Sequence, residues 1–114
     1  MTIKVSLNPT ADPPVTVSPT VENVNQGNQT ITWVPAQGQP AFTFVGVAFL
    51  TGQNQFSNLA NSTSPVQMSV TENNNNSGTN YPYVIMVNLN GVDYCSVKQD
   101  GTTGNGGTPI IHNN

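Results

Sequence analysis

The sequence predicts an all-β protein, a two-sheet β-sandwich of about seven to eight short strands. Three observations predict it. Apolar residues recur with period 2 in one segment after another. Pro, Gly and Asn interrupt these segments roughly every 8–12 residues, as in sandwich proteins. No segment has the sustained 3.6-residue period that a helix longer than one turn needs. We expect residues 1–114 to form a single domain.

The first third of the chain predicts short strands with proline-rich breaks. TIKVSL places Ile3, Val5 and Leu7 on one face, and PVTVSP repeats the alternation with Val15 and Val17. The intervening NPTADPP is expected to be a loop, because Pro donates no ladder hydrogen bond and keeps its predecessor out of a helix. The first strand is therefore expected to stop and restart, and the restart can cross to the other sheet.

The middle of the chain predicts a strand in TITWVP, ended by Pro35, and a second strand in AFTFVGVAFL. The second segment is almost entirely apolar, which favours a strand buried on both faces. Gly46 inside it indicates a bulge or a close backbone approach. TGQNQFSNLANSTSP is expected to be a long polar connection held to the core by Phe56 and Leu59.

The C-terminal half begins with VQMSVT, whose alternation places Val66, Met68 and Val70 inward. The polar run ENNNNSGTN that follows predicts a mobile loop.

The clearest strand pair lies in YPYVIMVNLNGVDYCSV. One face of its first strand carries Tyr83, Ile85, Val87 and Leu89. The Asn90-Gly91 pair after it is the strongest short signal for a hairpin turn. QDGTTGNGGTP then predicts a Gly-rich loop, and the last residues predict a closing segment at a sheet edge.

Composition and charge exclude several classes of partner. Charged residues make up only 6% of the chain, the net charge is −3, and the only basic residues are Lys4 and Lys98. Nucleic-acid binding needs a cluster of cations, so nucleic acids are excluded as partners, and anionic membrane surfaces are disfavoured for the same reason. Because the net charge is low, electrostatic repulsion between copies of the chain is weak. We expect association with a second copy or another protein through the sandwich edges.

The N-terminus, MTIKVSLNP, has no apolar core and no small-residue cleavage site, so it predicts a strand and no signal peptide. No apolar run is long enough for a membrane-spanning helix. We expect the chain as given to be cytoplasmic, and export of a processed form stays an open alternative.

The only cysteine, Cys95, and the only histidine, His112, raise the question of a copper or redox site. A blue-copper site needs two His and one Cys, so this chain lacks at least one imidazole. A Cys–His catalytic dyad requires the two side chains to meet, yet His112 lies in a terminal segment where fraying is common. We expect Cys95 to be a buried thiol and His112 a surface residue.

No other catalytic, cofactor or metal signal emerges. Zinc requires a cluster of Cys, His or carboxylate ligands, and calcium requires converging oxygens. The five acids are scattered: Asp12, Glu22, Glu72, Asp93 and Asp100. The Gly-rich GTTGNGG lacks the Lys of a phosphate-binding loop. We therefore assign no catalytic, cofactor-binding or metal residue and expect no enzyme. Tyr81, beside the Asn run, would form a sugar-stacking surface if it were exposed.

Two stretches resemble known sandwich families. NQTITWVP followed by an apolar strand resembles cupredoxins, and GTNYPYVIMV resembles a strand that cupredoxins and immunoglobulin-like domains share. In that likeness Tyr81 or Tyr83 takes the place of a tyrosine corner. The order VTVSP, VNQGNQTITW, YPYVIMVNLNG and TPIIHNN is similar to the DP-EP family of small bacterial proteins over nearly the full length. The resemblance implies an immunoglobulin-like or cupredoxin-like Greek-key β-sandwich without copper, and it implies no activity.

The expected function is therefore a non-catalytic β-sandwich module that acts through protein association. The alternative is a small-ligand or carbohydrate-binding module. A metal or redox protein that uses Cys95 and His112 is the least favoured reading, because the second histidine is missing.

Overall fold

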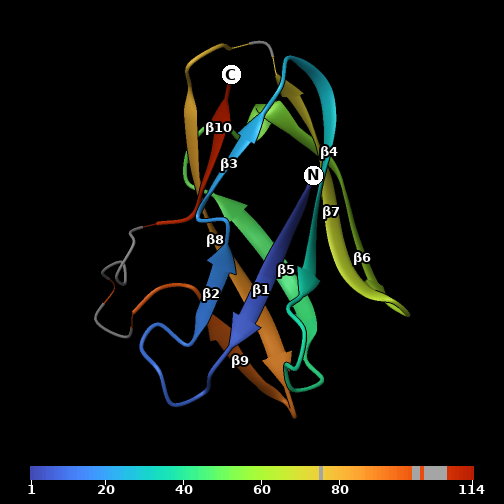
Figure 1. The fold of residues 1–114 in the computed structure, drawn as a ribbon, viewed down its shortest axis with the longest axis vertical. Coiled ribbons are helices and arrows are strands. Elements are labelled where there is room, and N and C mark those ends of the chain that lie inside the picture. Colours follow the sequence, from blue (N-terminus) through green and yellow to red (C-terminus); the bar gives the residue numbers. More distant parts are fainter. Residues whose placement is uncertain (75, 99–100, 102–107) are drawn as a thin grey trace.

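The computed structural model describes residues 1–74, 76–98, 101 and 108–114. These residues form two sheets packed as a sandwich, so the predicted all-β fold is confirmed (Figure 1). The described part contains ten strands and one short 3-10 turn, η1 (Gln53–Gln55). The strands are β1 (Thr2–Leu7), β2 (Val15–Ser18), β3 (Val21–Val24), β4 (Gly27–Pro35), β5 (Thr43–Phe49), β6 (Phe56–Thr63), β7 (Val66–Asn74), β8 (Asn80–Leu89), β9 (Val92–Cys95) and β10 (Ile110–Asn113).

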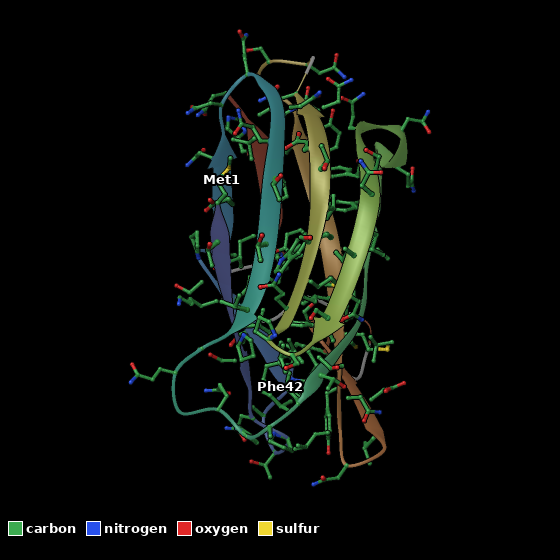
Figure 2. The ribbon with its side chains drawn as sticks, turned by 90° about the vertical axis from the view of Figure 1, so that its right-hand side faces the viewer. Met1 and Phe42 are labelled. Carbon is green, nitrogen blue, oxygen red and sulfur yellow. The ribbon has the colours of Figure 1, made fainter. Side chains whose placement is uncertain are left out.

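The first sheet has the order β2-β1-β4-β7-β6. Its pairs are antiparallel except β1 with β4, which run parallel. Figure 2 shows β4, β7 and β6 side by side along this sheet, with Phe42 at its lower end. β2 turns back onto β1, so the interrupted first strand restarts in the same sheet, and the crossing to the second sheet comes one strand later, at β3.

The second sheet has the order β3-β10-β8-β5. The strand β9 also pairs with β8, opposite residues 86–89, whereas β10 pairs with residues 80–82. The last strand is thus held between two neighbours, parallel to β3 and antiparallel to β8. The prediction of a closing segment at a sheet edge was wrong, because β3 forms this edge of the sheet and β10 lies between β3 and β8.

The inward face of each strand supplies the core. The alternation predicted for residues 3–7, 66–70 and 83–89 is confirmed, with every second side chain turned inward. At the centre, the Trp33 indole donates from Nε1 to the Tyr83 hydroxyl over 3.1 Å, and the two rings meet edge to face. Both side chains are fully buried, so this hydrogen bond satisfies the one polar atom that each brings into the core.

Three predictions for the middle of the chain were wrong. β5 is an edge strand, and its outward residues Val45 and Ala48 are exposed, so the strand is not buried on both faces. The expected polar connection contains the eight-residue strand β6, which pairs with β7. Phe56 packs on the core as expected, but Leu59 is 57% exposed and does not. The bulge predicted at Gly46 is confirmed by a register shift between Phe44 and Gly46.

The Asn90-Gly91 turn joins β8 to β9 as predicted. Both residues have positive φ, 53° and 84°, and Leu89 pairs with Val92 across a two-residue loop. This register determines which face of the sheet each β9 side chain points to, because successive side chains of a strand alternate between the two faces. Tyr94 lies opposite the buried Val87 and packs on the core.

Candidate functional site

The structure does not bring Cys95 and His112 together. Cys95 pairs with Met86 near the lower end of β8, and His112 pairs with Asn80 at its upper end (Figure 1). These partners are six residue steps apart along β8, which is about 20 Å at ~3.3 Å per residue. The two side chains therefore cannot ligate one metal ion or form a catalytic dyad.

Cys95 is half-buried, so the expectation of a core thiol was wrong. The hairpin register places it opposite Met86, which alternates with the fully buried Ile85 and Val87 and so faces outward. Its Sγ lies 3.8 Å from the Val97 carbonyl oxygen. It borders a surface hollow of about 420 Å³ with Asp93 and the loop at residues 9–14.

His112 is half-buried and sits in a sheet rather than in a frayed tail. Its Nδ1 lies 2.5 Å from the Asn80 Oδ1, across the pair of strands β10 and β8. This contact holds the imidazole against its neighbouring strand. Within the described residues, no group of three or more His, Cys, Asp or Glu side chains lies close enough together to hold a metal ion.

Tyr81 is 3% exposed, so it offers no surface on which a sugar could stack. Its ring packs edge to face on Phe56, and Asn76 Nδ2 donates to its hydroxyl over 3.4 Å. Gly52 lies directly against the ring. Asn75, Asp100 and residues 102–107 of the Gly-rich loop lie outside the described residues, and no site is assigned to them.

A groove of about 480 Å³ lies between the edge strands β5 and β6. We call it the β5–β6 groove. Its apolar lining comes from both sheets: Val47, Phe49, Phe56, Leu59 and Val70. The rest of the lining is Ala48, Gln53, Ser57 and Asn58, so none of its residues is ionisable. Such a groove has an apolar floor and a neutral polar rim.

Two contacts set the shape of the β5–β6 groove. At one end, Asn61 Nδ2 of β6 donates to the Phe44 carbonyl of β5 over 2.6 Å and closes the gap between the strands. Along the groove, the Phe49 and Phe56 rings stack with centroids 3.5 Å apart. The edges of the two sheets are thus joined through side chains and leave a hollow beside the stacked rings.

A bulge in β6 builds the rim. The register with β7 shifts between Ser57 and Ala60, and Asn58 has a φ of 56°. A bulged residue loses its ladder partner and turns away from the sheet. Leu59, within this bulge, is the most exposed of the large apolar side chains that the structure describes, and it stands beside the groove.

Sequence reasoning missed this groove because FSNLANST shows no alternation. One signal was available: a structureless connection as long as residues 51–65 is uncommon in a compact domain and argues for a hidden element.

A second feature that the sequence did not reveal is a buried polar cluster. Glu72 and Asn74 point inward from β7, and Asn113 points inward from β10. Burial raises the pKa of Glu72 to about 6, and the nearby Asn113 amide opposes that rise. No pair of atoms between the two side chains meets the geometry of a regular hydrogen bond. In the sequence, Glu72 is only one of five scattered acids, and nothing there indicates that it is buried.

No protein-family model matches this chain, and no curated protein matches it. The resemblance to the DP-EP family therefore stays a prediction. No helix in the described part of the chain is long and apolar enough to cross a membrane.

Proposed function

We propose that this protein is a non-catalytic β-sandwich module that functions by self-association through the β5–β6 groove. The observation that carries the proposal is the exposed Leu59 beside an apolar hollow. A projecting side chain and a hollow on one face can fill each other across a two-fold axis, which is the geometry of an isologous dimer.

The edge strands support this proposal. Long edge strands are usually protected by charges, Pro or shortness. The other two edges have such protection: β2 and β3 have four residues each, and Pro19 stands between them. β5 and β6 have seven and eight residues and contain no charge and no Pro. Their bulges limit strand pairing locally, so side-chain packing in the groove is the main expected contact.

Electrostatics support a second copy as the partner. Most proteins with a large net charge repel their own copies, whereas this chain carries −3 and no ionisable residue at the groove. Burial of apolar surface would then drive association. We expect it to depend little on salt, since screening weakens only charged contacts.

Size-exclusion chromatography with light scattering over a concentration series tests the proposal. We expect the mass to rise from one chain toward two as concentration rises, at low and at high salt alike. A mass of one chain at every concentration would count against self-association.

A small apolar ligand is the second candidate occupant. The groove volume of about 480 Å³ lies within the range of small-molecule sites, and its lining is mostly apolar. Carbohydrate is less favoured, because Tyr81 is buried and provides no stacking surface. A monomeric protein whose groove resonances shift with apolar probes would favour this candidate over self-association.

A further inference from the structure

The polar cluster at the upper end of the sandwich presents oxygen atoms that nothing in the described structure satisfies. Glu72, Asn74 and Asn113, the Glu72 cluster, lie between the sheets where β7, β3 and β10 end (Figure 1). Glu72 and Asn113 are 0% exposed. Among the described residues, Gln55 Oε1 is the one other buried side-chain atom without a hydrogen-bond partner, so the unsatisfied atoms concentrate in this cluster.

Strand pairing and two hydrogen bonds from a side chain to the backbone bring the residues of the cluster together. Asn74 Nδ2 donates to the carbonyl oxygens of Val24 and Asn25, over 2.9 and 3.0 Å. Val24 is in turn the register partner of Asn113 in the β3–β10 ladder. Glu72 lies two residues before Asn74 on the same inward face of β7, and the Asn113 amide is close enough to affect its carboxyl group. The three side chains therefore converge from both sheets.

The cluster has more acceptors than donors. Four oxygens have no hydrogen-bond partner: Glu72 Oε1 and Oε2, Asn74 Oδ1 and Asn113 Oδ1. The only donor there without a partner is Asn113 Nδ2, because the Asn74 amide nitrogen already serves two carbonyls. An unsatisfied buried carboxylate is strongly unfavourable. A positively charged group among these oxygens would remove the deficit.

We propose that the Glu72 cluster binds a hard monovalent cation, Na⁺, with the Glu72 carboxylate and the Asn74 and Asn113 side-chain oxygens as ligands. Carboxylate and amide oxygens are the donors that hard cations prefer. One carboxylate neutralises one monovalent charge, whereas a divalent ion would leave a net charge in the interior, which is costly. Water molecules or backbone carbonyls would complete the coordination.

A bound cation would tie the last strand to the opposite sheet. Asn113 already accepts from the Gly78 amide and donates its own amide to the Thr79 carbonyl, so β10 is anchored to the β7–β8 connection. Joining its side chain to Glu72 would add a link from β10 to β7. The site would therefore stabilise the C-terminal strand more as the sodium concentration rises, with a logarithmic dependence above the dissociation constant.

Thermal unfolding in sodium chloride and in choline chloride of equal ionic strength, at a pH above 7, tests this proposal. At a Na⁺ concentration about tenfold above the dissociation constant, we expect the Tm to be roughly 4–8 °C higher in sodium. Glu72→Gln should abolish the difference. Glu22→Gln, on the inward face of β3 but outside the cluster, should retain it.

Equal Tm values in the two salts would overturn the proposal, and so would a sodium effect that persists in Glu72→Gln. Stabilisation by Ca²⁺ but not by Na⁺ would overturn the monovalent assignment. If Glu72→Gln does not fold, high-resolution crystals of the wild-type protein grown in sodium chloride decide the question. A density peak among the three side chains with oxygen neighbours clearly closer than the hydrogen-bond distance of about 2.7–2.8 Å is expected, and a peak at hydrogen-bond distances, as for water, would contradict it.

Discussion

The rings of Phe49 and Phe56 stack at a centroid distance of 3.5 Å with 7° between their planes, and they join the edge of one sheet to the edge of the other. Phe49 ends β5 and Phe56 begins β6, so the pair closes the connection that contains η1. This closure gives the β5–β6 groove a fixed apolar wall, beside which Leu59 projects.

Leu59→Gln is expected to weaken self-association at least tenfold with little change in stability. Leu59 is exposed, so it contributes little to the monomer, whereas a buried Leu in an interface contributes about 1.5–3 kcal/mol. Sedimentation equilibrium measures the dissociation constant. Val92→Gln, an equally exposed apolar residue on the hairpin, is the matched control and should leave association unchanged. Equal effects of both substitutions would contradict a specific role for the groove.

Tyr83→Phe should lower the free energy of unfolding by about 1–3 kcal/mol. The substitution leaves the fully buried Trp33 Nε1 without its acceptor while removing little volume. Urea unfolding followed by Trp33 fluorescence measures the loss. Tyr94→Phe, which removes the hydroxyl of a half-buried residue, should cost less. Similar losses of unfolding free energy in the two variants would contradict a stabilising role for the Trp33–Tyr83 hydrogen bond.

Gly52→Ala should be more destabilising than Gly38→Ala. Both glycines have positive φ, 70° and 80°, so both substitutions introduce backbone strain. A Cβ at Gly52 would also clash with the Tyr81 ring, whereas the space around Gly38 is open. We expect a further loss of about 1–3 kcal/mol at Gly52, measured by chemical denaturation. Equal losses would mean that Tyr81 moves aside freely.

Glu72 should make stability fall as pH rises in a buffer without metal ions. Its pKa is raised from 4.5 to about 6 in the folded protein, so the folded state binds more protons than the unfolded state between these values. The stability that the raised pKa of Glu72 contributes is complete below pH 4.5 and is lost as the pH rises through 6. We expect wild type to lose on the order of 1–2 kcal/mol relative to Glu72→Gln between pH 4 and pH 7.5. Parallel pH profiles for the two proteins would contradict this.

The sequence predicted the sheets well where one face is buried. Residues 81–89 alternate because their odd-numbered side chains form the core, and Asn90-Gly91 determines the turn that follows. That turn also implied the direction of Cys95. A two-residue loop pairs Leu89 with Val92, which places Cys95 opposite the outward Met86. The prediction of a buried thiol failed because it rested on residue type instead of register.

Edge positions and long-range neighbours could not be predicted in the same way. β6 has polar side chains on both faces because solvent lies on both, so no periodicity reveals it. β10 is held by β3, which lies some ninety residues earlier in the chain, and no local pattern encodes that pairing. The groove and the Glu72 cluster both depend on such pairings, and this is why the sequence indicated neither.

Amide chemical-shift mapping on dilution tests the central claim most directly. As the wild-type protein is diluted from high to low concentration, resonances of Ala48, Asn58 and Leu59 should move together toward their monomer values. Resonances of β2 and β3 at the opposite edges should stay constant. The absence of any concentration-dependent shift, or shifts centred on β2 and β3, would contradict self-association through the β5–β6 groove.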